Sequence, residues 1–305
     1  MKHIFIINPF AGSGNGIAEL KSKLEKVSFD YSVYETKCSG DATQYISQYC
    51  ESNSEPVRFY SCGGDGTAKE VAEGVVEFAH ASMSIFPIGS GNDFVKYYGG
   101  EELFRNVDDI ANADNEKIDI IQITHSDGQK TYSLNVCNFG FEAYAASVMN
   151  KVRRKPIIGG GNSYTTGVLC GLFGAMKSKG KIYADGKLLN ESGKFLLCTV
   201  ANGGYVGGGY NCAPRASVSD GELEVCLVRP FSVFTLARLI GVYKKGKHLD
   251  DPGFKKYITY CRAKKVELVT EKPQAVCIDG EIIYTTHFVA EVKDGAVNFA
   301  APVKQ

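Results

Sequence analysis

Three glycine-rich segments contain the polar side chains that could do chemistry, at residues 8–16, 63–67 and 89–93. Glycine has no Cβ atom, so its backbone N–H groups can approach phosphate oxygens closely. Asp65 and Asp93 place a carboxylate in the second and third segments, and carboxylate oxygens are ligands that Mg²⁺ prefers. One such segment alone is more often an ordinary turn, but the three together indicate a site for phosphate and Mg²⁺.

Each of these segments follows a short apolar run with the pattern of a buried strand, at residues 4–7, 57–62 and 84–88. In an open α/β sheet, ligands bind at the edge formed by the carboxyl ends of the strands. A helix that begins just after such a strand adds partial positive charge near a phosphate. The chain contains no GxxxxGK[ST] sequence and its first segment is not GxGxxG, which excludes a P-loop and the standard dinucleotide fingerprint.

The elements that position these segments alternate between strand and helix patterns in the first part of the chain. Apolar residues recur at helical spacing within residues 17–27, 40–50 and 67–79, and a further strand-like run lies at 31–35. This βαβα alternation is typical of a parallel sheet with helices on both faces. We therefore predict a doubly wound, mostly parallel α/β domain at residues 1–119.

Strand patterns dominate the rest of the chain, and residues 131–138 read as one strand. Asp185-Gly186 lies between two strand-like runs and predicts a tight hairpin turn. Helical patterns interrupt the strands at residues 142–151 and 233–244. We predict a mainly antiparallel β-sandwich domain at residues 120–297, with a C-terminal tail at about 298–305 that returns to the first domain.

Composition favours a globular protein that does not bind nucleic acid. The chain has 34 basic and 34 acidic residues, so its formal net charge is zero, whereas nucleic-acid-binding proteins usually carry a basic excess. Its 10 cysteines form no CxxC pair and many lie in apolar runs, as free thiols do. No segment has the ~20 apolar residues that span a bilayer. These features predict a reduced, cytoplasmic protein.

Three local basic clusters lie at residues 153–155, 244–247 and 264–265. Each is explained by a solvated surface, or by contact with anionic lipid or phosphate. If lipid contact holds, the protein associates with a membrane only transiently and at its surface.

The second segment, Gly63-Gly64-Asp65-Gly66-Thr67, resembles the nucleotide loop of the diacylglycerol kinase catalytic-domain family. That family includes bacterial soluble lipid kinases and sphingosine kinases, and NAD kinases are more distant relatives. Further segments similar to those of the family occur in the family's order along nearly the whole chain, at residues 8–12, 39–43, 87–94, 138–143, 202–214, 220–223 and 279–281.

The resemblance implies a kinase that transfers the γ-phosphate of ATP to a lipid hydroxyl, with diacylglycerol as the default acceptor. Glu281 would be the general base that takes the proton of that hydroxyl. Asp65, Asp93 and Asp119 would form an acidic network around Mg²⁺ and the phosphates. The implied ATP site consists of Asn8, Pro9, Phe10, Ala11, Gly12, Thr36, Gly64, Asp65, Gly66, Thr67, Glu70 and Ser90.

The resemblance also implies a structural Mg²⁺, because related bacterial enzymes hold one with an Asp and nearby backbone carbonyls. The matching positions are Ser217, Asp220 and Glu222. The sequence departs from the family at Ser13, where a basic residue is frequent, and at Lys69, where Asn is frequent.

Simpler structural roles remain open for several of these residues. Asp119 could be an ordinary strand-edge acid, Asp220-Gly221 a turn, and Glu281 a hairpin residue, because the preceding Asp279-Gly280 is a strong turn signal. Residues 164–176, rich in Leu, Phe and Gly, could line a lipid entrance or form a core helix.

The sequence therefore predicts a lipid kinase whose partners are ATP, Mg²⁺ and a lipid at a membrane surface. NAD kinase is the alternative enzyme, because the Gly-Gly-Asp-Gly-Thr segment is shared with that group. A catalytically inactive nucleotide-binding regulator is the alternative outside catalysis. Which lipid is the acceptor, and whether the protein is a homodimer, are left open.

Overall fold

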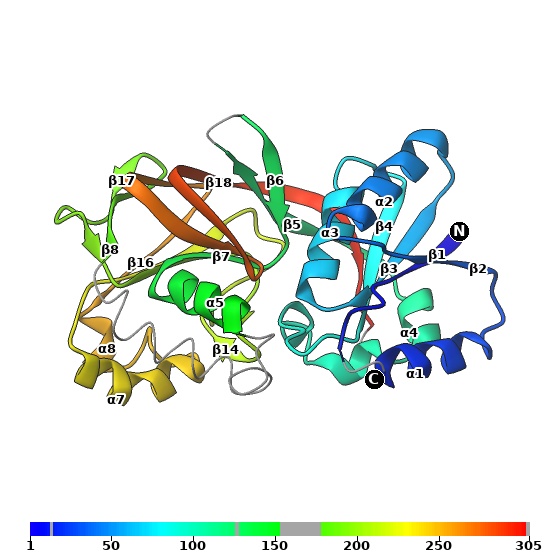
Figure 1. Ribbon diagram of the computed structural model, residues 1–305, viewed down its shortest axis with the longest axis horizontal. Coiled ribbons are helices and arrows are strands. Elements are labelled where there is room, and N and C mark those ends of the chain that lie inside the picture. The colour runs from blue at the N-terminus through cyan, green and yellow to red at the C-terminus, as the bar shows by residue number, and fades with distance from the viewer. Residues whose placement is uncertain (13–14, 126–127, 153–177, 303–305) are drawn as a thin grey trace. The chain divides into compact units, whose positions relative to one another are not determined.

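The computed structural model describes residues 1–12, 15–125, 128–152 and 178–302, with the side chains of residues 149–152 excepted. Ser13 and the segments 153–155 and 164–176 singled out above lie outside the described residues. The chain divides into two compact units (Figure 1). Unit 1 comprises Met1–Ile120, Val218–Asp220 and the chain from Lys293 onward, and unit 2 comprises Ile121–Ser217 and Gly221–Val292.

Unit 1 is built on four parallel strands, in the order β4-β3-β1-β2. Their bounds are β1 (Lys2–Ile7), β2 (Tyr31–Glu35), β3 (Val57–Gly63) and β4 (Ala81–Pro87). Every residue of β3 and β4 is buried, as expected of a parallel sheet covered on both faces. The predicted doubly wound, mostly parallel domain is confirmed.

Helices cover both faces of this sheet. α2 (Asp41–Ser52) and α3 (Asp65–Val75) lie on one side, and α1 (Asn15–Leu24) and α4 (Val107–Asn112) on the other (Figure 1). This arrangement follows from right-handed crossovers, since the chain moves outward from β1 to β2 and then back across β1 to β3 and β4. Two short 3₁₀ helices, Phe94–Lys96 and Glu101–Phe104, follow β4.

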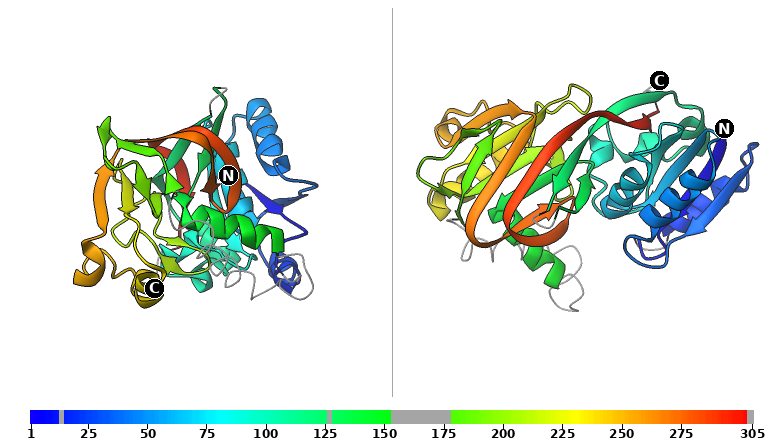
Figure 2. Two further views of the ribbon diagram at one scale, coloured as in Figure 1. Left: turned by 60° about the vertical axis from the view of Figure 1, so that its left-hand side comes forward. Right: turned by 90° about the horizontal axis from the view of Figure 1, so that it is seen from above.

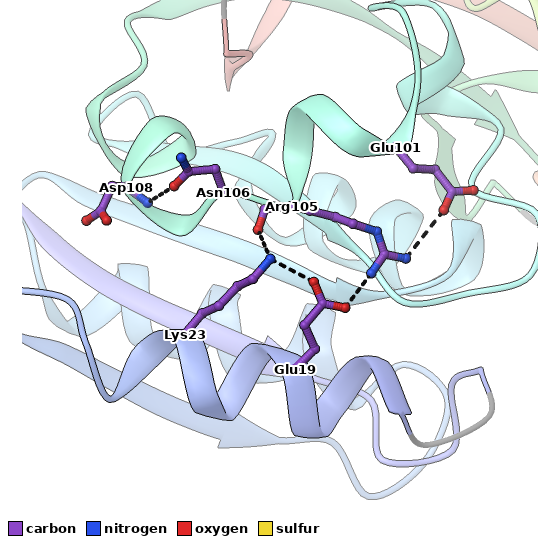
Figure 3. A network of polar contacts seen from close by, with 6 residues as sticks. All are labelled: Glu19, Lys23, Glu101, Arg105, Asn106 and Asp108. Carbon is purple, nitrogen blue, oxygen red and sulfur yellow. Dashed lines mark hydrogen bonds and ion pairs between the residues drawn. The ribbon is translucent and has the colours of Figure 1, made fainter.

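A network of ion pairs joins α1 to the segment before α4 (Figure 3). Glu19 accepts hydrogen bonds from Lys23 and Arg105, both at 2.7 Å. Lys23 also donates to the backbone carbonyl of Arg105 at 2.7 Å. The side chains are about one-third exposed, so water screens each pair and the network is worth roughly 1 kcal/mol.

The chain returns to unit 1 through the end of β18 (Glu281–Ala300). Phe299 pairs with Met83 of β4 in parallel register, and the Ser84 hydroxyl donates to the Ala300 carbonyl at 2.7 Å. The Phe299 ring packs 5.4 Å from the ring of Phe94. The last strand therefore fixes the segment that follows β4.

Unit 2 is a largely antiparallel structure in which the strands run in the order β16-β15-β12-β7-β17-β18. Their bounds are β7 (Val136–Gly140), β12 (Leu197–Ala201), β15 (Leu223–Val228), β16 (Ile258–Ala263) and β17 (Lys265–Ile278), with β16 at the edge of the sheet. The register of β17 against β18 shifts between Val269 and Gln274, and β17 also pairs with β9 (Lys181–Ala184). Figure 2 shows β17 and β18, in orange and red, as a long curved pair.

Further strands complete unit 2. β5 (Asn115–Thr124) begins in unit 1 and pairs with β6 (Lys130–Ser133). β10 (Lys187–Leu188) pairs with β9 across Asp185-Gly186, where both residues have positive φ, so the predicted hairpin is confirmed. The remaining strands are β8 (Ser178–Lys179), β11 (Lys194–Phe195), β13 (Tyr205–Val206) and β14 (Tyr210–Asn211).

Two apolar cores lie on opposite faces of the unit 2 sheet. One includes the fully buried rings of Phe139, Phe195 and Phe288. The other packs strand residues against α7 (Val233–Lys244) and α8 (Pro252–Lys255), through side chains such as Leu239 and Phe254. α5 (Phe141–Val152) and α7 form where helical patterns were predicted.

The prediction of one strand over residues 131–138 is wrong. β6 ends at Ser133 and β7 begins at Val136. The backbone N–H groups of Leu134 and Asn135 donate to the carboxylate of Asp279 instead of to a neighbouring strand, so the ladder is interrupted.

The nine cysteines that the structure describes are free thiols, as predicted for them. Within the described residues, no helix is both long and apolar enough to cross a bilayer.

Candidate active site

The first, second and third glycine-rich segments meet at the carboxyl ends of β1, β3 and β4. The N–H groups of Ile88 and Gly89 both donate to the Gly63 carbonyl, at 2.9 and 3.0 Å. A Cβ atom added to Gly89 would lie 2.4 Å from the Cα atom of Gly64, and one added to Gly12 would lie 2.3 Å from the Ile88 carbonyl oxygen. Glycine is required here because backbone packs on backbone.

Asn8 fastens the first segment to the second. Its N–H donates to the Cys62 carbonyl at 3.0 Å, and its side-chain amide donates to the Thr67 hydroxyl at 3.1 Å. The side-chain oxygen Oδ1 of Asn8 accepts a hydrogen bond from the Phe10 N–H at 2.9 Å. The Phe10 side chain is 81% exposed, so it is available to a ligand.

Asp65 and Asp93 are brought together by this packing. The Asp93 N–H donates to Asp65 Oδ1 at 2.6 Å. A Cβ atom on Gly91 would lie 2.6 Å from Asp65 Oδ2 and 3.7 Å from Asp93 Oδ2, so the second oxygens of both carboxylates border the same small region. Lys96 pairs with Asp93 Oδ1 at 2.6 Å. Sequence reasoning missed Lys96, whose only signal is its position three residues after Asp93.

The chemistry of these donors fits Mg²⁺, which prefers carboxylate, phosphate and water oxygens. Asp65 and Asp93 offer two carboxylates at one place. Among the residues whose positions are described, no group of three or more His, Cys, Asp or Glu side chains could hold a metal ion. The predicted Mg²⁺ at Asp65 and Asp93 stays a prediction.

The first turn of α3 faces the same segments. α3 begins at Asp65, directly after the extended Gly64. The first N–H groups of a helix have no partner within it and carry partial positive charge, which favours phosphate. Ser90, in the third segment, is exposed.

Glu70 and Thr36 occupy supporting positions. The Glu70 carboxylate accepts hydrogen bonds from the N–H groups of Gly40 and Ala42, at 2.9 and 3.3 Å. These groups lie at the amino end of α2, where a carboxylate is stabilised by the helix dipole. Thr36 is buried, and its N–H donates to the Ile7 carbonyl at 2.9 Å. The Thr36 contact therefore lies next to the first glycine-rich segment, whereas the Glu70 contacts tie α3 to α2.

Asp119 is fully buried at a different place in unit 1. Its Oδ1 accepts a hydrogen bond from the Gly295 N–H at 2.8 Å. Its own N–H donates to the Val218 carbonyl at 2.6 Å. These contacts tie β5 to Val218–Asp220 and to the returning chain, and the predicted role of Asp119 in the acidic network stays a prediction.

In unit 2, Asp279 and Gly280 form a two-residue turn between β17 and β18, with φ of +46° and +91°. The Asp279 carboxylate accepts four hydrogen bonds of 2.7 to 3.2 Å, from the Ser133 hydroxyl and from the N–H groups of Leu134, Asn135 and Val136. Glu281 begins β18 and is exposed. Asp279 therefore anchors the turn that presents Glu281.

Glu142 is a further acid with a distinctive environment in unit 2. Its carboxylate accepts hydrogen bonds from the Tyr243 hydroxyl at 2.6 Å and from the Thr199 hydroxyl at 3.2 Å. Burial raises the pKa of Glu142, and these two hydrogen bonds oppose that shift. The acid links α5 to α7 and to the sheet.

The positions named for a structural metal fall in both units. Asp220 belongs to unit 1, whereas Ser217 and Glu222 belong to unit 2. Glu222 pairs with Arg262 at 3.0 Å. The structural Mg²⁺ stays a prediction.

Comparison with known proteins adds family matches to this geometry. Residues 2–123 match the family described as the diacylglycerol kinase catalytic domain. Residues 135–301 match the family described as the YegS C-terminal NAD kinase beta sandwich-like domain.

Curated relatives align along nearly their whole length. The diacylglycerol kinase of Bacillus subtilis (strain 168) is 26% identical over 283 residues, which is 90% of this chain and 88% of that protein. A protein of Chromohalobacter salexigens named probable lipid kinase YegS-like is 26% identical over 294 residues, which is 94% of this chain and 88% of that protein.

Solved structures share the fold. A diacylglycerol kinase structure from Bacillus anthracis str. Sterne has a TM-score of 0.66 at 21% identity, covering 98% of this chain and 96% of that one. A second structure from that organism has a TM-score of 0.75 at 23% identity, with the same coverage.

Proposed function

Because this chain belongs to the diacylglycerol kinase catalytic-domain family and carries that family's YegS-type C-terminal domain, we propose that it is an ATP-dependent lipid kinase. The single observation that carries the proposal is the contact between Asp65 and Asp93, with 2.6 Å between Asp65 Oδ1 and the Asp93 nitrogen. It places two carboxylates at a junction of glycine-rich segments, where phosphates and Mg²⁺ are bound together in other nucleotide sites.

ATP would bind with its phosphates over this junction. The N–H groups around Gly12, Gly64 and Gly66 would donate to phosphate oxygens, aided by the amino end of α3. Asn8 would hold the first segment in place, and the exposed Phe10 would contact the nucleotide. Mg²⁺, when bound by Asp65 and Asp93, would neutralise phosphate charge, which is a main requirement of phosphoryl transfer.

The proposed transfer joins the acceptor hydroxyl oxygen to the γ-phosphorus. The bond from that phosphorus to the bridging oxygen breaks, and ADP leaves with the electron pair. The proton of the hydroxyl passes to the Glu281 carboxylate, which acts as general base. Glu281 is exposed at the start of β18, so its carboxylate is accessible to an acceptor.

Diacylglycerol is the acceptor that we propose first, because the relatives from Bacillus subtilis and Staphylococcus carnosus carry the name diacylglycerol kinase. Each is about one-quarter identical to this chain, so the acceptor is a proposal separate from the reaction class.

Incubation of the purified protein with γ-labelled ATP, Mg²⁺ and a panel of acceptors tests the function. The panel contains diacylglycerol, monoacylglycerol, phosphatidylglycerol, a sphingoid base, a polyprenol and NAD. We expect label in a lipid, first of all in phosphatidic acid, and far less label with Asp65→Asn. Label only in NADP would replace the lipid kinase by an NAD kinase, and no transfer at all would favour a regulator.

A further inference from the structure

The outward surface of α7 carries both apolar and basic side chains. Its exposed residues recur at helical spacing, and they are Val233, Phe234, Ala237, Arg238, Gly241 and Lys244, with the exposed Lys245 directly after the helix. The opposite face, with Leu236, Leu239 and Tyr243, is buried in the apolar core. We call the outward residues of α7, together with Lys256, the α7–α8 face.

A large aromatic ring protrudes at the amino end of this face. Phe234 is 88% exposed and the neighbouring Val233 is 39% exposed. The Ser232 hydroxyl accepts a hydrogen bond from the Thr235 N–H and caps the helix there. The exposed ring is therefore held on the first turn of a regular helix rather than on a loose loop.

A cationic hollow of about 340 Å³ lies beside the ring. It is lined by Phe234, Thr235, Arg238, Gly253, Lys256 and Tyr257. A Cβ atom on Gly253 would lie 3.0 Å from Arg238 Nη2, so the guanidinium rests against α8. The Lys256 ammonium lies 5.1 Å from the centre of the Tyr257 ring. Two cations thus border one hollow next to an exposed phenyl ring.

The segment that forms this surface is strongly basic in a chain that is neutral as a whole. Residues 229–256 contain seven Lys or Arg and two Asp, a formal net charge of +5, whereas the whole chain has a net charge of zero. Both acids are engaged elsewhere. Asp250 pairs with Arg215 at 2.7 Å, and Asp251 accepts hydrogen bonds from the first N–H groups of α8.

The α7–α8 face is complementary to an anionic membrane surface in two respects, its positive charge and its exposed aromatic ring. Headgroup phosphates attract clustered basic side chains, and the boundary between headgroups and acyl chains accepts an aromatic ring from a helix that lies in the plane of the surface. A nucleic acid would satisfy the charge but would leave the Phe234 ring without an apolar environment.

We propose that the α7–α8 face docks on membranes containing anionic phospholipid, with Arg238 and Lys256 on headgroup phosphates and Phe234 at the acyl boundary. The inference rests on the proposed function for its purpose, since a kinase of membrane lipids must reach its acceptor in a bilayer. The charge and the exposed ring that support it are independent of the active site.

Sedimentation with vesicles, in the absence of ATP, tests the face directly. One set of vesicles is phosphatidylcholine alone, and the other contains phosphatidylglycerol in addition. We expect binding to the anionic vesicles to fall at least about tenfold in the double variant Arg238→Glu/Lys256→Glu, and to fall also in Phe234→Ser. The control Lys179→Glu/Lys187→Glu changes the charge equally at two exposed lysines of unit 2 and should bind as the wild type does.

Three results would overturn the proposal. The face variants could bind anionic vesicles as the wild type does, the control variant could lose as much binding as they do, or the wild type could bind equally well to vesicles with and without phosphatidylglycerol. Far-ultraviolet circular dichroism and thermal melting check that all variants fold. If a single-stranded RNA displaces the protein from vesicles and Phe234→Ser binds that RNA normally, the face is a nucleic-acid surface instead.

Kinase assays separate this proposal from the proposed function. With a short-chain acceptor dispersed in solution, the face variants should keep wild-type activity, whereas with the same headgroup embedded in anionic vesicles they should lose most of it. If the wild type phosphorylates no lipid, the proposed function fails, and vesicle binding still decides the role of the face.

Discussion

The N–H of Asp93 donates to Asp65 Oδ1 at 2.6 Å. This hydrogen bond joins the turn after β4 to the first residue of α3, although 28 positions separate the two residues. It orients the Asp65 carboxylate so that Oδ2 lies beside Gly91, towards the region that Asp93 Oδ2 also borders. The two carboxylates are therefore held side by side, and variants can test their proposed role separately from the fold.

Asp65→Asn should abolish most activity without unfolding the protein. The amide oxygen of Asn can still accept the Asp93 N–H, but the negative charge is lost. We expect kcat to fall roughly 100- to 1000-fold, as when one transition-state electrostatic contact is removed, with a melting temperature close to that of the wild type. Steady-state kinetics measure this effect. Asp30→Asn, at an exposed position of unit 1, is the control and should stay fully active.

Glu281→Gln should remove the general base while preserving ATP binding. Loss of a general base costs roughly 100- to 10,000-fold in rate. Because the Glu281 side chain is exposed, we expect the variant to fold normally. Calorimetric titration with ATP should show near wild-type affinity. Glu271→Gln changes another exposed acid of unit 2 and should leave kcat unchanged; a Glu281→Gln enzyme of normal activity would remove Glu281 from the mechanism.

Asp279→Asn should lower the stability of the folded protein, and not only its activity. Asn tolerates the positive φ of this position, but it replaces one acceptor oxygen by a donor amide that faces backbone N–H groups. We expect a loss of about 2 kcal/mol in the free energy of unfolding, measured by urea denaturation.

Asp185→Asn is the matched control for that change. Asp185 also begins an Asp-Gly turn with φ of +46° and accepts hydrogen bonds from two backbone N–H groups. Because Asp185 is exposed, water can replace those bonds and the cost should stay below about 1 kcal/mol. Equal losses in the two variants would show that Asp279 has no special anchoring role.

Gly89→Ala should lower stability because its methyl group meets backbone. The new Cβ atom would lie 2.4 Å from Gly64 Cα and 2.8 Å from Asn92 Oδ1. We expect a loss of about 2 kcal/mol. Gly66→Ala is the control, since nothing lies within 4 Å of its Cβ position and alanine favours the first turn of α3, where Gly66 lies, by up to about 1 kcal/mol. Thermal melting of the two variants should therefore shift in opposite directions.

Acid should destabilise unit 2 through His248. This side chain is fully buried beside Tyr243, and burial lowers the pKa of His248 from 6.5 to about 4, against the opposing effects of the Cys212 backbone and Asp250. As the pH falls below 6.5, the unfolded chain takes up a proton that the folded chain does not. Stability is therefore lost between pH 6.5 and 4, by about 3 kcal/mol in total.

Unfolding at pH 7.0 and pH 5.0 measures that dependence. His248→Phe keeps an aromatic ring in the core and should show a smaller difference in the free energy of unfolding between the two pH values. An unchanged pH dependence in His248→Phe would show that another group is responsible.

The sequence by itself predicted features that depend on neighbouring residues. The helix predicted at residues 233–244 has those bounds in the structure, because apolar residues recur at helical spacing and Ser232 caps its first turn. The hairpin at Asp185-Gly186 forms because these two residue types readily adopt positive φ. The strand at residues 31–35 also forms as predicted.

Some elements were misjudged because tertiary contacts override local patterns. The strand expected at 131–138 is broken where its N–H groups meet the Asp279 carboxylate, about 145 positions away in the chain. β16, at Ile258–Ala263, was not predicted, since its mixed pattern becomes a strand through pairing with β15. The helix expected at 67–79 begins at Asp65 and ends at Val75.

For the candidate site, too, part could be predicted from the sequence and part depended on the tertiary structure. Residue types and their order allowed us to predict which glycines and acids form a phosphate site, because such preferences belong to single residues and short segments. Only the folded chain decided that Asp65 binds the Asp93 backbone, that Lys96 pairs with Asp93, and that Glu70 holds the amino end of α2. Such contacts depend on how distant strands align in the sheet, and no short segment of the sequence contains that information.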